Sequence, residues 1–177
     1  MELTGKQVLV LAGPDFEDRE LFYPLYRMQE AGATVKVAGI GEKIYKGKYG
    51  VPVEVDGAAI DFVKENWHAV FIPGGWAPDK IRADQAALEI VRKAAKNGAV
   101  VAAICHAGWV LASADIVQGK TVTSFVNIKD DLIHAGAKWV DKEVVVDGNL
   151  VTSRKPADLP AFCREVIKLM AKAKVTA

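Results

Sequence analysis

Residues 99–106 read AVVAAICH, a run of six small or branched apolar residues followed directly by Cys105 and His106. An unbroken apolar run of this length is typical of a strand buried on both faces of a parallel sheet. Three further runs have the same character: residues 7–12 (QVLVLA), 34–38 (TVKVA) and 69–73 (AVFIP). Gly13-Pro14 ends the first of these and Gly74-Gly75 the third, as expected where buried strands stop.

Amphipathic helices are expected between these strands. The clearest are residues 15–30, 84–97 and 159–173, with shorter helical segments at 61–65, 106–113 and 128–135. Asp15 is expected to cap the first helix, residues 45–55 and 143–153 to form hairpins, and 121–124 a short strand. This alternation predicts an α/β three-layer sandwich: a flavodoxin-like, mostly parallel sheet with helices on both faces. The length of 177 residues corresponds to one domain, residues 1–177.

The composition excludes several classes of protein. Hydrophobic residues make up 51% and the net charge is only +1, so neither disorder nor a nucleic-acid partner is indicated. No apolar run approaches the roughly 20 residues of a membrane-spanning helix, and the polar first residues do not resemble a signal peptide. Cys105 and Cys163 lie in different settings, so both are expected to be reduced thiols in the cytoplasm, Cys163 in the core.

Three segments follow strands of the predicted sheet: residues 13–17, 74–79 and 105–108. Ligands of open α/β sheets bind outside the carboxyl ends of the strands, near a switch in strand order. If the three strands are neighbours, their loops meet in one crevice. This convergence predicts where the chemistry of the protein takes place.

Cys105 is the strongest candidate for a reactive residue. Its position between a buried strand and the start of a helix resembles the strand–nucleophile–helix turn of hydrolases. The first free N–H groups of the helix favour an anion there, so the thiol is expected to ionise more easily than a free cysteine. The backbone N–H groups of His106 and Gly75 are the expected oxyanion donors. The alternative is a small buried cysteine that only packs.

The partners of Cys105 are less certain from spacing alone. His106 is the obvious base, but neighbouring side chains on a helix do not face each other, so a tight bend is required. Glu17 is expected across the crevice from the sulfur, where a carboxyl near a thiolate holds its proton and can donate a hydrogen bond. Asp15, Asp18 and Glu20 are interpreted as cap and surface residues. The four tryptophans look scattered, and no His or Cys spacing suits a metal.

Several motifs together resemble one known family. They are Asp15-Phe16-Glu17-Asp18, Pro73-Gly74-Gly75 with Ala77-Pro78, Ala103-Ile104-Cys105-His106, Ile128-Lys129-Asp130-Asp131, Trp139-Val140-Asp141, residues 144–149 and Pro156-Ala157-Asp158-Leu159. In this order they resemble the PfpI-type intracellular peptidases of the ThiJ/PfpI superfamily, which includes the parkinsonism-associated protein deglycase. The match extends over nearly the whole chain.

This resemblance implies a flavodoxin-like sandwich with a nucleophilic Cys105, Glu17 beside the sulfur, and Gly75 and His106 as oxyanion donors. It implies a homodimer or hexamer in which His106 pairs with an acidic residue of a neighbouring subunit, and Asp79 occupies that position where the family usually has Glu. Gly74, Trp76 and Phe125 fall on the substrate pocket. Trp76 stands where Arg is common and Phe125 where Tyr is common. No metal and no cofactor are implied.

Four functions are compatible with these residues to different degrees. The first is a cysteine hydrolase that acts on peptide or amide bonds or on glycated protein adducts. The second is a cofactor-independent conversion of methylglyoxal to lactate by the same residues, in the manner of a glyoxalase. The third is a non-enzymatic redox sensor or chaperone that uses Cys105. The fourth, nucleotide binding, is disfavoured because the chain has no G-x-G-x-x-G or P-loop motif.

Overall fold

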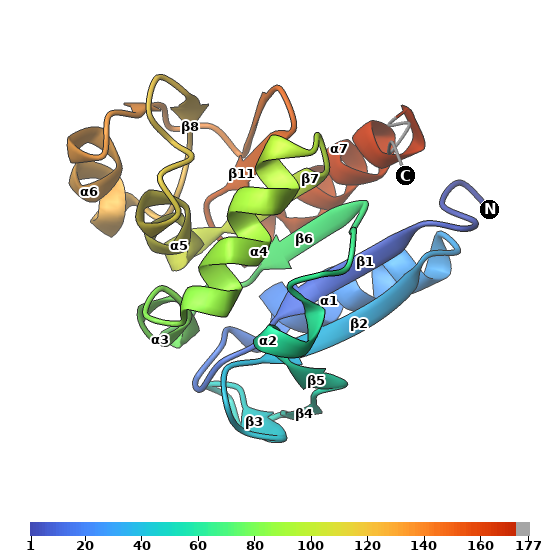
Figure 1. Cartoon of the computed structure of the whole chain (residues 1–177). Coiled ribbons are helices and arrows are strands. Elements are labelled where there is room, and N and C mark those ends of the chain that lie inside the picture. Colours follow the sequence, from blue (N-terminus) through green and yellow to red (C-terminus); the bar gives the residue numbers. More distant parts are fainter. Residues whose placement is uncertain (173–177) are drawn as a thin grey trace.

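The computed structural model describes residues 1–172 and contains a seven-stranded sheet (Figure 1). The strand order is β10-β11-β7-β6-β1-β2-β5, and all pairs are parallel except β10 with β11. The predicted flavodoxin-like arrangement is therefore confirmed. The strands are β1 (Gln7–Leu11), β2 (Thr34–Gly39), β5 (Gly57–Ala58), β6 (Ala69–Ile72), β7 (Val100–Ile104), β10 (Val144–Asp147) and β11 (Leu150–Ser153).

Helices cover both faces of this sheet (Figure 1). On one face α1 (Asp18–Glu30) packs against α7 (Leu159–Lys172), and on the other α2 (Ala59–Phe62) packs against α4 (Gln85–Lys96). Short helices α3 (Ala77–Ile81) and α5 (Gly108–Ser113) contact each other, and α6 (Lys129–His134) packs on α5. The wholly apolar strands β6 and β7 are buried between the helical layers, which is why their residues do not alternate with polar ones.

Some local predictions were wrong. Helix α1 begins at Asp18, and Glu17 caps it by accepting a hydrogen bond from the Glu20 N–H at 3.0 Å; Asp15 does not cap it and has a φ of 56°. Helix α3 was not anticipated. The expected strand at 121–124 is β8 (Thr121–Val122), which pairs with β9 (Lys138–Trp139) outside the main sheet. The expected end of the last helix, Ala173, lies outside the described residues.

Both hairpins form as expected. Strands β3 (Ile44–Lys46) and β4 (Pro52–Glu54) pair antiparallel in a small separate sheet, and β10 and β11 pair at the edge of the main sheet. Within residues 1–172 no helix is both long enough and apolar enough to cross a membrane.

The strand order positions the site, because the chain adds β2 on one side of β1 and β6 on the other. Strand β1 lies between β2 and β6, and β6 lies next to β7. The loops after β1, β6 and β7 therefore leave the sheet side by side, as predicted. Phe16 and Gly75 form a backbone bridge, and the Trp76 N–H donates to the Asp15 carbonyl at 2.9 Å. These bonds join the first two loops directly.

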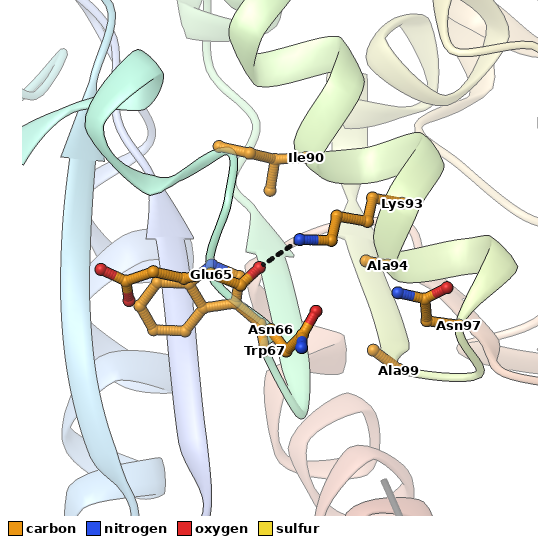
Figure 2. A pocket seen from close by; sticks show the side chains of 8 residues that line it. All are labelled: Glu65, Asn66, Trp67, Ile90, Lys93, Ala94, Asn97 and Ala99. Carbon is orange, nitrogen blue, oxygen red and sulfur yellow. Dashed lines mark hydrogen bonds between the residues drawn. The ribbon is translucent and has the colours of Figure 1, made fainter. Parts of the chain in front are cut away.

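Away from these loops, Lys93 on α4 binds the backbone that follows α2 (Figure 2). Lys93 Nζ donates to the carbonyl oxygens of Val63, Lys64 and Glu65 at 3.2, 2.9 and 3.0 Å. These carbonyls follow the end of α2, where helical partners run out. The hollow beside Lys93 has a volume of about 20 Å³, which is space for about one water molecule and too small for a substrate.

We expect Lys93→Met to lower the free energy of unfolding by about 2 kcal/mol, since charge-assisted hydrogen bonds to three carbonyls are lost. Urea unfolding followed by circular dichroism measures this. Lys96→Met removes an exposed lysine from the same helix and is the matched control. Equal stabilities of the two variants would contradict the assignment.

Candidate active site

Cys105 lies at a sharp turn between the last residue of β7 and a short 3-10 helix, Cys105–Ala107. Its φ of 62° is left-handed, a strained conformation for a residue with a side chain and one that recurs at functional sites. The turn places Cys105 Sγ 3.3 Å from His106 Nδ1, so the two adjacent side chains meet. The tight bend that the sequence required is therefore present, and the base lies within reach of the thiol.

Two glycines bring backbone against the sulfur. The N–H groups of Gly75 and His106 hydrogen-bond to Cys105 Sγ. Gly75 has a φ of 74°, and a Cβ there would collide with the Asp15 carbonyl and the Glu17 nitrogen. A Cβ on Gly74 would lie 2.6 Å from Cys105 Cβ. A side chain at either glycine would therefore push the loop that follows β6 away from Cys105.

The carboxyl group beside the sulfur belongs to Glu20, and the prediction that Glu17 lies there was wrong. Glu20 is 2% exposed, its Oε2 accepts from the Gly74 N–H at 2.8 Å, and its side chain faces Cys105. Glu17 instead caps α1 and forms an ion pair with Arg19. Because α1 begins at Asp18, Glu20 lies on the same face of the helix as Glu17 but about one turn further along. This position brings its carboxyl group to the Gly74 N–H.

Asp18 is also buried, against the expectation of a surface residue. It is 6% exposed, and its two oxygens accept from the N–H groups of Tyr49 and Val51 at 2.9 and 3.0 Å. Asp18 thereby ties residues 47–51 to the start of α1. A Cβ on Gly47 would overlap the Asp18 carboxylate, so only glycine fits at that position.

Burial is the largest influence on the pKa values of Glu20, Cys105 and His106. It raises the pKa of Glu20 to about 8, with a further rise from the nearby Glu17 carboxylate. Burial, followed by the Glu20 carboxyl, raises the pKa of Cys105 to about 12, although the Gly75 and His106 N–H groups oppose this. Burial of Cys105 therefore opposes the easy ionisation that the sequence predicted for this thiol.

His106 complements this thiol. Burial lowers the pKa of His106, and the nearby positive charge of Lys48 lowers it further. The imidazole is therefore neutral at pH 7 and can accept the proton of Cys105. The site holds a protonated thiol next to a neutral base, so the thiolate forms when the base takes that proton.

Three aromatic rings surround His106. Phe125 stacks on the imidazole with centroids 5.1 Å apart, while Trp109 and Trp76 approach at 5.2 and 5.8 Å. Trp76 is 62% exposed and forms the outer edge of the site. The interpretation of the tryptophans as scattered was wrong for Trp76 and Trp109: one precedes α3 and the other lies in α5, and both contact the His106 ring.

The pocket over Cys105 has a volume of about 170 Å³, small beside the 300–1,000 Å³ of drug-sized sites. Its lining residues are Glu17, Arg19, Glu20, Lys48, Gly75, Trp76, Cys105, His106, Phe125, Lys155 and Pro156. Asp79 is not among them: it forms a 3.0 Å ion pair with Lys80 and lines the adjacent hollow with Trp76 and Trp109. Among residues 1–172 of one chain, Asp79 therefore does not pair with His106.

Cys163 lies in the core, as predicted, and away from the pocket over Cys105. It is 1% exposed on the buried side of α7, and burial raises its pKa to about 12. Both cysteines are free thiols. Among residues 1–172, no three His, Cys, Asp or Glu side chains gather in a way that would hold a metal ion.

The site combines a cysteine at a strained strand-to-helix turn with a neutral imidazole and two converging N–H groups. In an α/β sandwich this arrangement is typical of a cysteine nucleophile, for which Cys105 is the candidate. The model of the DJ-1/PfpI family matches residues 6–169. The chain belongs to the DJ-1/PfpI family, which confirms the resemblance inferred from the motifs.

Individual relatives agree with this assignment. The chain is 43% identical to Deglycase PfpI of Pyrococcus furiosus over 93% of this chain and 99% of that protein. It is 41% identical to YraA of Bacillus subtilis, which is named as a cysteine protease, over 94% of this chain and 99% of that protein. Among solved structures, DJ-1beta of Drosophila melanogaster has a TM-score of 0.89 at 29% identity, covering 95% and 91%. The first two names, a deglycase and a cysteine protease, are those of hydrolase-like enzymes.

Proposed function

We propose that this protein is a cytoplasmic cysteine hydrolase that removes carbonyl-derived adducts from protein side chains or cleaves amide bonds. The observation that carries the proposal is the 3.3 Å approach of Cys105 Sγ to His106 Nδ1 beneath the converging N–H groups of Gly75 and His106. The names of the relatives, deglycase and cysteine protease, are those of enzymes of this kind.

In the proposed reaction with an amide substrate, His106 Nδ1 takes the thiol proton as Cys105 Sγ forms a bond to the amide carbonyl carbon. The developing oxyanion accepts hydrogen bonds from the N–H groups of Gly75 and His106. These groups no longer bind the sulfur once it has formed the bond to carbon. The carbon–nitrogen bond then breaks, and the amine departs with the proton from His106. A water molecule hydrolyses the remaining thioester, which restores the thiol and releases the acid.

A second candidate is the conversion of methylglyoxal to lactate, favoured by the small pocket and by the proton that Glu20 holds at neutral pH. Cys105 would add to the aldehyde to give a hemithioacetal. His106 would move the C1 hydrogen to C2 as a proton, while Glu20 exchanges protons with the oxygens, giving a lactoyl thioester. Water would then release lactate. No external oxidant or reductant is needed.

Comparative turnover tests the two candidates. The wild-type protein is assayed with methylglyoxal, with a methylglyoxal adduct of N-acetyl-lysine, and with a short fluorogenic peptide. Release of free amine from the adduct or the peptide with no lactate from methylglyoxal supports the hydrolase. Lactate formation alone supports the second candidate. An absence of turnover on all three would contradict both.

We also propose a homodimer or hexamer in which Asp79 of the partner subunit reaches His106. Asp79 is more than half exposed and lies next to the Trp76 and Trp109 edge of the site, so it is available to a neighbouring chain. We expect activity per chain to fall when the protein is diluted until sedimentation shows monomers.

We expect Asp79→Asn to lower kcat roughly tenfold, a fraction of what a general base contributes. The exposed Asp130→Asn is the matched control and should act like the wild type. Full activity of a verified monomer would contradict a shared site, whatever the effect of Asp79→Asn.

A further inference from the structure

The rim of the pocket over Cys105 is positively charged at neutral pH. Three cationic side chains line it, those of Arg19, Lys48 and Lys155. Arg19 is neutralised by its ion pair with Glu17, and Glu20 retains its proton because its pKa is raised to about 8. Among residues 1–172, no carboxylate lies within ion-pair distance of Lys48 or Lys155. Two lysine charges therefore remain uncompensated around the nucleophile.

The backbone holds Lys48 at this rim. Its N–H donates to the Phe16 carbonyl at 2.9 Å, and the next N–H, that of Tyr49, donates to buried Asp18. Lys48 Nζ lies 5.0 Å from the centroid of the Tyr49 ring. Its charge lowers the pKa of both His106 and Glu20, so it acts on the groups around the sulfur.

Lys155 reaches the same rim from the opposite end of the chain. It precedes a short 3-10 helix, Pro156–Asp158, which Arg154 holds through bonds of 2.8 and 3.1 Å to Asp158. Arg154 also binds Asp141 at 2.7 Å. The segment that carries Lys155 is thus held by one partly buried ion pair, to Asp158, and one exposed ion pair, to Asp141.

We propose that the site takes substrates with a carboxylate close to the reacting carbonyl, and that Lys48 and Lys155 receive this carboxylate. The identity of the substrate rests on the proposed function. The preference of the pocket for anions over uncharged molecules can be measured without any turnover. Lys48 and Lys155 are both exposed, so water weakens the attraction of each for a carboxylate, and the two together are expected to stabilise it more than either one alone. Substrates of this class are 2-oxo acids and adducts formed by them, as distinct from uncharged dicarbonyls.

Alkylation of Cys105 by iodoacetate and by iodoacetamide measures this selectivity. The reagents share a leaving group and differ in charge, and both consume the same thiolate, so the ratio of their rates is independent of the thiol pKa. We expect the iodoacetate-to-iodoacetamide ratio to fall about threefold in Lys48→Met and in Lys155→Met, and about tenfold in the double variant. Mass spectrometry of the Cys105 peptide gives each rate.

Lys46→Met is the matched control, because Lys46 is exposed two residues before Lys48 but lines a different hollow. Its ratio should equal that of the wild type. Added salt should lower the iodoacetate rate of the wild type and leave the iodoacetamide rate unchanged. A double variant with the wild-type ratio overturns the proposal.

A second measurement does not need the thiol to react. Pyruvate and butane-2,3-dione differ by a carboxylate in place of an acetyl group, and their binding is followed through the NMR signals of the His106 ring. We expect pyruvate to bind about tenfold more tightly than the dione, and the double variant to remove the difference. Equal binding of the two by the wild type refutes the proposal. A lysine-dependent preference without any turnover would refute only the proposed hydrolase function.

Discussion

Cys105→Ala is expected to lower turnover of every substrate by at least about 10³-fold, because the atom that forms the covalent intermediate is removed. The loss should appear in kcat, since the pocket walls that bind substrate are unchanged. Steady-state assays with the substrate that the wild type turns over best measure it. The far-ultraviolet circular dichroism spectrum should stay that of the wild type, since the Cys105 side chain is small.

The second cysteine provides the matched control. Cys163 is 1% exposed on the core side of α7, and Cys163→Ala should keep full activity while losing roughly 1 kcal/mol of stability. Cys105→Ser tests whether a hydroxyl can replace the thiol and should be nearly as inactive as alanine. If Cys105→Ala retained more than about a tenth of wild-type kcat, the covalent mechanism would have to be abandoned in favour of general acid–base chemistry.

The sheet and the location of the site were predictable from the sequence because both depend on short-range pattern. Unbroken apolar runs such as residues 99–104 mark strands buried on both faces, and Cys105 follows the most uniform of them. The carboxyl ends of neighbouring parallel strands share one edge, which places the loops that contain Gly75 and Cys105 together. No distance information was needed for these steps.

The choice between Glu17 and Glu20 depended on where one helix begins. Both residues lie on one face of α1, so periodicity alone cannot separate them. The actual start at Asp18 makes Glu17 the cap, and Glu20 then meets Gly74 and the sulfur. Element boundaries follow from capping hydrogen bonds and from tertiary contacts, and the cap observed here lies two residues after the expected Asp15.

The thiol pKa could not be predicted from sequence position for a related reason. Placement at the start of a helix favours the thiolate, whereas burial opposes it, and the balance depends on how deeply the loops around Gly75 and Glu20 enclose the sulfur. With Cys105 8% exposed, burial is the larger effect. Trp109 likewise joins the site only through the packing of α5 against the His106 turn.

Glu20→Gln is expected to remove a large pH dependence of stability. The folded-state pKa of Glu20 is raised from 4.5 to about 8, so between these values the folded protein holds a proton that the unfolded chain releases. The stability associated with this proton is complete below pH 4.5 and is lost as the pH rises through 8. From pH 5.5 to 8.5 the wild type should lose roughly 3 kcal/mol more stability than the variant, at about 1.36 kcal/mol per pKa unit.

The substitution isolates the charge because glutamine keeps the shape of Glu20 and an oxygen that accepts from the Gly74 N–H at 2.8 Å. Glu20 Oε1 is buried and accepts no hydrogen bond from the described residues, so an ionised carboxylate there would carry a buried charge with one oxygen unpaired, whereas the amide of glutamine carries no charge. Urea unfolding at the two pH values measures the difference, with the exposed Glu54→Gln as a control that should follow the wild type. Parallel profiles for the wild type and Glu20→Gln would show that Glu20 is already ionised at neutral pH. The rim of the pocket would then carry one more negative charge beside the thiol, and Glu20 could not supply a proton to the substrate.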